Sequence, residues 1–363
     1  MTADGDLPAT AWSMTRGMRD PEHHLILGGA GFIGRHVARL LTLQGCRVTV
    51  VDRRIPGRWT VRGVEGPEYR RLDLVDADWS TLLADVDVVH HYAWSSVPAS
   101  ANANPGSDLQ SNMTLTTGLL DALRRRGRGR LVFASSGGSV YGRLRHAPAR
   151  EDHPIAPLTA YGAGKATAET YLSLYRSLYG VDCRIARIAN PYGAGQNPRR
   201  GLGAVTTFAF NALHGRPIAI WGDGETIRDY VHVSDIAEGL LALASAPVLG
   251  SEFAFNLGSG TGVSLNQIVA ELELQLGRPV PVSRGEARSF DIPVSVLAVG
   301  LARRRLGWRP RLSFEEGLAQ TLTDLRGRRT ISNLGPGSRV EATRVRSRPL
   351  EPAQSGGPLF ATS

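Results

Sequence analysis

Three glycines, Gly28, Gly31 and Gly34, separate a short apolar run at residues 25–27 from a segment with helical periodicity. The apolar run is typical of a buried parallel strand. The segment behind the glycines places its apolar residues on one helix face: Ile33, Val37, Leu40 and Leu41. Gly28 permits a tight turn, Gly31 lets the backbone approach a pyrophosphate, and Gly34 lets the helix pack closely on the strand. Because the N–H groups at the start of such a helix attract an anion, this stretch predicts a dinucleotide site.

A second predicted strand, at residues 46–52, ends in the carboxylate of Asp52. A carboxylate in this place accepts hydrogen bonds from the adenosine ribose of a dinucleotide. Arg53 and Arg54 follow and suit the 2′-phosphate of NADP, but Asp52 would repel that phosphate. The pattern therefore predicts NAD as the cofactor, with NADP as the alternative.

The chain continues with strands that alternate with helices. We expect strands at residues 69–74, 86–91, 130–134 and 182–188, and helices at 107–127 and 160–179. This alternation predicts an α/β protein with a Rossmann-type, doubly wound parallel sheet. Ligands of such a sheet bind beyond the carboxyl ends of its strands.

The pattern changes after residue 190, where turn-rich segments alternate with shorter elements. We expect a helix at 203–214, a strand at 218–221, and a helix that Ser234 caps and that ends at residue 245. The predicted division is an NAD-binding domain at 23–189, to which 228–245 return, and a smaller C-terminal substrate-binding domain at 190–329. Residues 1–22 and 330–363 are predicted to be a disordered leader and a disordered tail, since they lack a periodic apolar pattern.

Composition narrows the choice of partners. The net charge is +9, from 42 Lys and Arg against 33 Asp and Glu, yet no recognition motif or basic stripe with interleaved aromatics indicates nucleic-acid binding. The excess charge is better explained by attraction for anionic substrates. No apolar run is long enough to predict a membrane span. The two cysteines, Cys46 and Cys183, form no metal-binding spacing and suggest a reducing cytoplasm.

Tyr161 and Lys165 are four residues apart, so they share one face of the predicted helix at 160–179. A phenol is a poor base at neutral pH, and a neighbouring ammonium group would lower its pKa. Ser136 follows a predicted strand and is placed to hydrogen-bond the same substrate oxygen. The three residues predict a proton-transfer site beside the nicotinamide.

These motifs, in this order, resemble the extended short-chain dehydrogenase/reductase family over about residues 23–326. The branch with the strongest resemblance contains the NAD-dependent nucleotide-sugar epimerases and dehydratases, of UDP-glucose 4-epimerase type. The segments that carry the resemblance are 28–34, Asp52, 91–94, Ser136, 141–142, 161–165, 190–193 and 228–231.

The resemblance implies a role for each matching residue. It implies Ser136, Tyr161 and Lys165 as the catalytic triad, a nucleotide sugar as the substrate, and a homodimer built on the helices at 107–127 and 160–179. The implied cofactor contacts are Gly28, Gly31, Phe32, Ile33, Gly34, Asp52, Asp73, Leu74, Tyr92, Ala93, Tyr161 and Lys165. The implied substrate contacts are Ser96, Asn190, Arg228 and Arg288, and no metal is implied. Asp73 equally suits a loop cap.

Three reactions of this family fit the sequence to different degrees. A 4-epimerase, acting on UDP-glucose, UDP-galactose or their N-acetyl forms, is the favoured interpretation. A 4,6-dehydratase needs an Asp-Glu pair after the catalytic serine, where this chain has Gly137 and Gly138. A 4-ketoreductase would use the same triad and remains an alternative, whereas an idle NAD-binding scaffold would be expected to lose Tyr161 or Lys165.

Two further departures affect the site. Trp94 stands where the family usually has a small residue. The serine loop is one residue longer than the commonest form, so Ser135 and Ser139 remain alternatives to Ser136.

Overall fold

The computed structural model describes residues 21–55, 60–61, 64–200, 203–247, 249–287 and 292–333. Its centre is a seven-stranded sheet in which every neighbouring pair is parallel. The strands in spatial order are β12 (Ala254–Leu257), β8 (Asp182–Ile188), β7 (Arg130–Ser136), β6 (Val88–His91), β1 (His23–Leu27), β2 (Arg47–Asp52) and β5 (Glu68–Arg71). The predicted Rossmann-type fold is confirmed, and the strand order reverses between β1 and β6.

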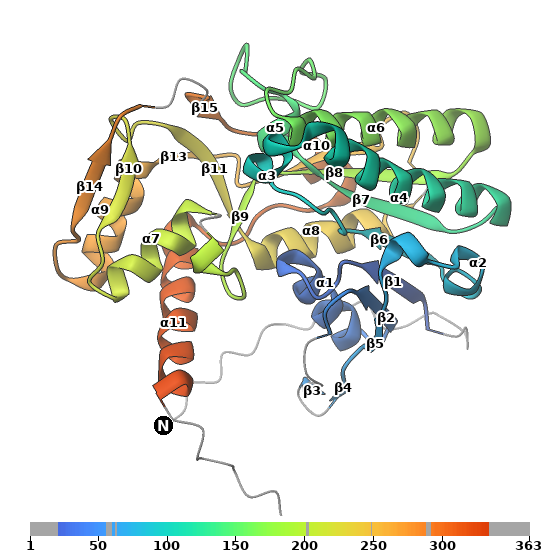
Figure 1. Ribbon diagram of the computed structural model, residues 1–363, viewed down its shortest axis with the longest axis horizontal. Helices are drawn as coiled ribbons and strands as arrows, with labels where there is room; N and C mark the ends of the chain where they lie inside the picture. The colour runs from blue at the N-terminus through green and yellow to red at the C-terminus, as the bar shows by residue number, and fades with distance from the viewer. Residues whose placement is uncertain are drawn as a thin grey trace, which may run out of the picture.

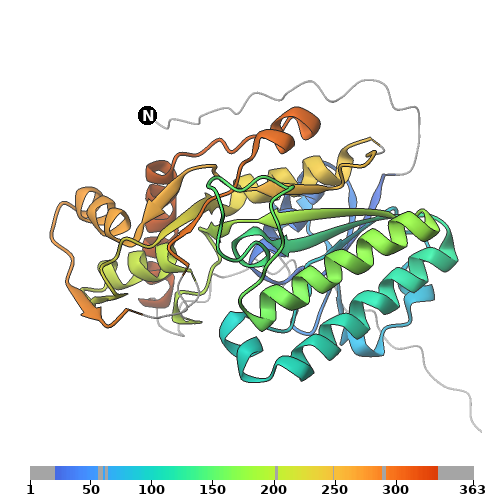
Figure 2. The same ribbon diagram turned by 90° about the horizontal axis from the view of Figure 1, so that it is seen from above.

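Helices cover both faces of this sheet, which gives three layers (Figure 1). On one face α1 (Phe32–Leu43), α8 (Val233–Ser245) and α10 (Gly300–Leu306) bury an apolar core with the sheet. On the other, α4 (Pro105–Arg126) and α6 (Ala160–Tyr179) pack side by side (Figure 2). The apolar stripes of these helices face the sheet, as expected for amphipathic helices.

The predicted bounds or caps of several elements are wrong, and three of these errors are informative. The third strand ends at Arg71 because Asp73 accepts a hydrogen bond from the Val75 N–H and starts the 3-10 turn Leu74–Asp76. Strand β7 extends beyond residue 134 to Ser136, since it pairs with β8 as far as Ile188. The cap of α8 is the side chain of His232, not Ser234.

A second, smaller group of elements extends from the sheet (Figure 1). Strand β11 (Ile227–His232) pairs with β9 (Asn190–Tyr192), β13 (Gly262–Ser264) and β15 (Val294–Ser295), and β10 (Ile218–Trp221) pairs with β14 (Val282–Gly285). Helices α7 (Ala204–Leu213), α9 (Leu265–Leu276) and α11 (Phe314–Asn333) share a separate apolar core with these strands.

The remaining elements are short. They are β3 (Thr60–Val61), β4 (Val64–Glu65), α2 (Trp79–Leu82), α3 (Pro98–Ala103), α5 (Gly137–Val140) and the 3-10 turn Pro198–Arg200. No helix in the described ranges is long and apolar enough to cross a membrane.

The ends of the chain differ partly from expectation. Helix α11 continues to Asn333, so the first four residues of the predicted disordered tail are helical. The rest of that tail, and residues 1–20 of the predicted leader, lie outside the described residues.

Candidate active site

The glycine turn between β1 and α1 is shaped by close backbone approach. Gly28 has φ +77°, and a Cβ there would lie 2.7 Å from the Ala93 backbone nitrogen. A Cβ on Gly34 would lie 2.5 Å from the Gly29 Cα. Gly31 is the N-cap of α1 and has no side chain to accept hydrogen bonds from the first turn. These features fit the pyrophosphate of a dinucleotide, which binds at such helix starts.

Asp52 lies at the end of β2, beside this turn. Its carboxylate accepts the N–H of Ala30 at 3.2 Å and the N–H of Arg54 at 3.1 Å. Two backbone donors therefore fix the orientation of the carboxylate at the end of β2. The side chain of Arg54 is exposed.

The other predicted cofactor contacts surround the same edge. Phe32 and Ile33 begin α1 and are half-buried. Leu74 is buried, and Asp73 forms the loop cap described above. Tyr92 and Ala93 follow β6 next to Gly28, and the Tyr92 hydroxyl hydrogen-bonds His90 at 2.8 Å.

Lys165 lies on the buried face of α6, with 3% of its surface exposed. Its ammonium donates to the Ala134 carbonyl at 2.7 Å and lies 3.8 Å from the ring centroid of Trp94. Burial lowers the pKa of Lys165 to about 7, although the carboxylates of Glu169 and Asp108 raise it. Lys165 is the only lysine in the printed sequence.

Tyr161 lies on the same face of α6, its ring centroid 5.8 Å from the Lys165 ammonium. Burial and the Asp108 carboxylate raise the pKa of Tyr161 to about 12, and a hydrogen bond with Ser136 lowers it. The pKa of Tyr161 is therefore raised, not lowered as the neighbouring ammonium alone predicted, because burial has the largest effect.

The three candidate serines have different partners. Ser136, at the end of β7, lies close enough to Tyr161 for its hydroxyl to lower the pKa of that phenol, and it donates to the Ser139 hydroxyl at 3.2 Å. Ser135 is buried and donates to the Glu169 carboxylate. Of the three serines, Ser136 is thus the one that lies beside Tyr161. Ser135 instead belongs to the buried polar network around Glu169.

A buried ion pair between Glu169 and Arg187 lies next to the Ser136–Tyr161–Lys165 cluster. Glu169, one turn beyond Lys165, binds the Arg187 guanidinium with contacts of 2.8, 3.0 and 3.3 Å. Arg187 also donates to the Tyr141 hydroxyl, which donates to Asn256. The network joins α6 to β8 and to the loop after β7, so it fixes the backbone that carries the serines.

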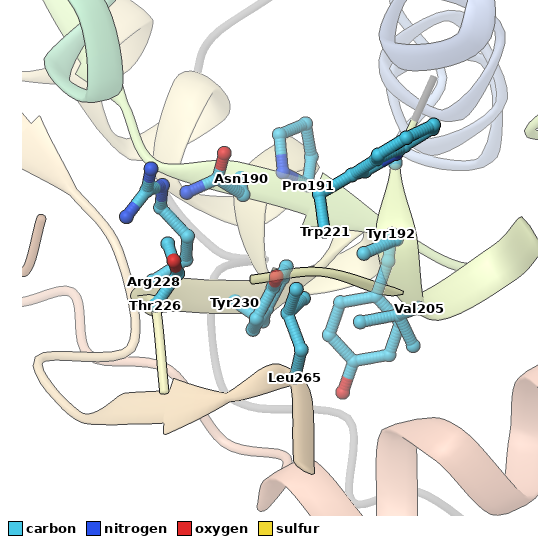
Figure 3. Close-up of a pocket in the computed structure, with 11 residues that line it drawn as sticks. Asn190, Pro191, Tyr192, Val205, Trp221, Thr226, Arg228, Tyr230 and Leu265 are labelled. Carbon is cyan, nitrogen blue, oxygen red and sulfur yellow. The ribbon is translucent and has the colours of Figure 1, made fainter. Parts of the chain in front are cut away.

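A cavity of about 260 Å³ opens beside β9 and β11. Asn190 and Arg228 lie at one side of it, with the indole of Trp221 across from them (Figure 3). Its full lining is Asn190, Pro191, Tyr192, Gly203, Ala204, Val205, Trp221, Thr226, Arg228, Tyr230 and Leu265. Aromatic walls with an amide and a guanidinium suit a base and an anionic group.

Strand alternation explains how β11 builds this cavity. Arg228 and Tyr230 face the cavity, while Asp229, between them, points to the other side and accepts from Ser259, Gly260 and Leu297. Asn190 donates to the Asp229 carbonyl at 3.1 Å. The same backbone strand therefore fixes both the cavity wall and the loop after β12.

Ser96, another predicted substrate contact, is not part of the described cavity lining. Ser96 follows β6, and its hydroxyl is buried and without a hydrogen-bond partner among the described residues. Arg288 lies outside the described residues. Sequence reasoning missed Asp108 and Trp221 as site residues, because no motif marks them, and it missed Tyr230 although that residue lies in the motif at 228–231.

Comparison with known proteins agrees with this geometry. The Epimerase model, of the NAD dependent epimerase/dehydratase family, matches residues 24–258. The match spans the glycine turn, the Ser136–Tyr161–Lys165 cluster and most of the cavity. The chain belongs to this family of nucleotide-sugar enzymes, and its cofactor is NAD.

Individual relatives span nearly the same part of the chain. The UDP-glucose 4-epimerase of Mycolicibacterium smegmatis is 34% identical, over 84% of this chain and 98% of the relative. UDP-glucuronic acid decarboxylase 1 of Xenopus tropicalis is 32% identical, over 84% of this chain and 72% of the relative. The solved UDP-glucose 4-epimerase of Thermotoga maritima, with UDP-glucose, has 31% identity and a TM-score of 0.77, covering 84% of this chain and 99% of that one.

Proposed function

We propose that the chain is a nucleotide-sugar 4-epimerase that interconverts a UDP-hexose with its C4 epimer through a 4-keto intermediate. UDP-glucose and UDP-galactose, or their N-acetyl forms, are the first candidates. The observation that carries the proposal is the contact of Ser136 with Tyr161 beside buried Lys165, next to a cavity lined by Asn190 and Arg228.

The proton step belongs to Tyr161. Its phenolate takes the proton of the sugar 4-hydroxyl, and Ser136 hydrogen-bonds the same oxygen and steadies it. With a pKa of about 12 the phenol of Tyr161 is protonated at neutral pH, so the step needs additional positive charge nearby. NAD, when bound, supplies that charge on its oxidised nicotinamide ring and accepts the hydride from sugar C4. After the ketose has presented its other face, Tyr161 returns the proton to the 4-oxygen while the hydride goes back to sugar C4, so the cofactor would end the cycle oxidised as it began.

The two parts of the chain divide the binding. We propose that residues 23–189 with 228–245 hold NAD and that residues 190–329 hold the substrate. Support comes from the cavity, whose described lining residues all lie between 190 and 265, with Arg228 and Tyr230 contributed by the start of the returning segment. Arg228 and Arg288 are assigned to the diphosphate, because guanidinium groups bind phosphate oxygens bidentately.

The position after the catalytic serine argues against dehydration. A Cβ on Gly138 would lie 3.8 Å from both the Asn190 amide atoms, so position 138 faces the substrate side. A glycine there offers no acid or base to expel a 6-hydroxyl. Gly137 is buried, and a Cβ there would meet the Leu297 side chain at 2.5 Å. Neither position can therefore supply the second acid–base group of a dehydratase.

We also propose a homodimer formed through α4 and α6. The two helices pack together (Figure 2), and their solvent side carries exposed large apolar residues. These are Leu109, Tyr171, Leu174, Leu178 and Tyr179. On α6 the spacing of residues 171, 174 and 178 makes a continuous stripe, which is typical of a helix with a partner.

The test supplies one UDP-sugar with NAD in catalytic amount and follows products by chromatography. UDP-glucose or UDP-N-acetylglucosamine should yield its C4 epimer without net reduction of NAD, and the Tyr161→Phe variant should yield about 10²–10⁴ times less product per unit time. A 4-ketoreductase would instead consume NAD(P)H one for one with a 4-keto-6-deoxy sugar nucleotide. Release of CO₂ from UDP-glucuronic acid would indicate a decarboxylase. Either outcome, without epimerisation, replaces the proposal.

A further inference from the structure

Asp108 is a buried carboxylate close to the catalytic cluster, with only 8% of its surface exposed. Its Oδ1 accepts the Asn112 side-chain amide at 3.0 Å. Its Oδ2 is buried and has no hydrogen-bond partner among the described residues. A buried anionic oxygen is costly unless its charge is compensated.

Capping of α4 does not explain this burial. The N-cap is Asn104, whose side chain accepts the Ser107 N–H. Asp108 lies in the first turn, where a carboxylate favours the helix dipole, but a solvent-exposed carboxylate would do so equally well. The burial therefore points to an interaction on the neighbouring helix.

The unpaired oxygen faces the stretch of α6 that carries Tyr161 and Lys165. A Cβ on Gly164 would lie 3.9 Å from Asp108 Oδ2 and 3.3 Å from Cζ2 of Trp94. Because Gly164 has no side chain, the carboxylate and the indole both reach the helix surface at this point. Residues 161, 164 and 165 share one helix face.

The ammonium of Lys165 has few other sources of compensation. It contacts the Ala134 carbonyl and the rings of Trp94 and, at 4.6 Å, Phe133. The remaining groups that face it are His91 on β6, Tyr161 and Glu169 on α6, and Asp108 on α4.

These facing groups are not equivalent. Burial lowers the pKa of His91 to about 3, so the ring is neutral near pH 7. The Glu169 carboxylate already binds Arg187 and Ser135. Asp108 is thus the facing carboxylate whose charge no other described cation contacts.

We propose that Asp108 is a positioning residue, which keeps Lys165 as a charged ammonium beside Tyr161 in a cage closed by Trp94. Its effect on catalysis rests on the proposed function, whereas its electrostatic coupling to Lys165 does not. The carboxylate raises the pKa of both neighbours, and this gives the coupling a distinctive sign. Removal of the charge lowers both.

Because Lys165 is the only lysine, protein labelled with [¹³Cε]lysine gives a single side-chain signal, and NMR can follow its titration directly. In Asp108→Asn the midpoint for Lys165 is expected to fall by about one pH unit or more, the usual effect of a nearby opposite charge. Asn at position 108 still accepts from Asn112. The matched control is Asp121→Asn, on the same helix, where the exposed carboxylate accepts from Tyr175, and its Lys165 midpoint should not move.

The second readout is the pH profile of turnover. Because the Asp108 carboxylate raises the pKa of both Tyr161 and Lys165, the limbs that these two groups set move to lower pH in Asp108→Asn. A purely structural role would scale the profile without moving its limbs. Asp108→Glu, which keeps the charge, should restore the wild-type limbs.

Each result bears on one proposal. An unshifted Lys165 midpoint in folded Asp108→Asn overturns the positioning role, even in an active epimerase. A shifted midpoint in a protein that epimerises no UDP-hexose leaves the coupling standing and removes the proposed function. Asp108→Ser provides a second uncharged variant, and failure of both uncharged variants to fold would assign Asp108 to stability and overturn the proposal.

Discussion

Breaking the buried Glu169–Arg187 pair tests how much the layer beneath the active site contributes to stability. The two side chains are 4% and 8% exposed, and three N–H···O contacts of 2.8–3.3 Å join them. An exposed pair contributes about 1 kcal/mol or less. Removing one member of a buried pair costs about 3–5 kcal/mol, because it leaves the other charge without a partner. Glu169→Met is therefore expected to lower the free energy of unfolding by about 3–5 kcal/mol.

The pair is best measured with a double-mutant cycle. Urea unfolding followed by far-UV circular dichroism gives the free energy for Glu169→Met, Arg187→Met and the double variant, provided that the slope m is unchanged. The double variant should cost about 2–3 kcal/mol less than the sum of the single ones, since it leaves no unpaired charge. The control is Glu252→Met, in an exposed pair with Arg305, with an expected cost below about 1 kcal/mol. Additive single costs, or costs as small as the control, refute the reasoning.

Three further outcomes are expected. Tyr161→Phe should lower turnover about 10²–10⁴-fold with an unchanged circular dichroism spectrum, and Ser136→Ala should cost less, because it removes a hydrogen bond and not the proton carrier; wild-type turnover in Tyr161→Phe contradicts the assignment. Burial depresses the pKa of His91 to about 3 from its usual value of about 6.5, so the unfolded state binds more protons below pH 6.5 and stability is lost as the pH falls from there towards 3. At pH 5 this residue alone should cost about 2 kcal/mol relative to pH 8, and an unchanged urea midpoint between these pH values would exclude it. Leu178→Glu, at a position 62% exposed on α6, should give a monomer by light scattering, whereas Leu274→Glu, 76% exposed on α9, should leave the dimer intact.

The central fold is predictable because its signals are local. Helix α6 has the predicted bounds, since Thr159 caps its start and Gly180, in the left-handed region, ends it. Strand β10 also has its predicted bounds, with turn residues on both sides. The parallel direction of the strands follows from the alternation of strands and helices.

The prediction errors arise where contacts with a segment distant in the sequence determine the local structure. Strand β7 continues to Ser136 because β8 offers parallel partners to that point, which the local sequence does not reveal. His232 caps α8 although Ser234 has the commoner capping side chain. The aromatic wall of the cavity comes from β10 and β11, which belong to different sheets, so no spacing in the sequence connects Trp221 with Tyr230.

Two buried cations near one carboxylate show why position 165 has a lysine and not an arginine. The sequence has 42 lysine and arginine residues, and only Lys165 is lysine. Arg187 binds the Glu169 carboxylate directly, and that contact raises its pKa against the effect of burial. Lys165, one turn away, receives only a carbonyl oxygen and aromatic rings as direct contacts, and burial brings its pKa down to about 7. A guanidinium at position 165 would stay charged and would need a carboxylate of its own. The pKa of an ammonium can instead lie close to the ambient pH, where a modest change in nearby charge alters its protonation. Glu169 therefore stabilises the fold through Arg187. The protonation state of Lys165 can respond to a charge that binds beside Tyr161.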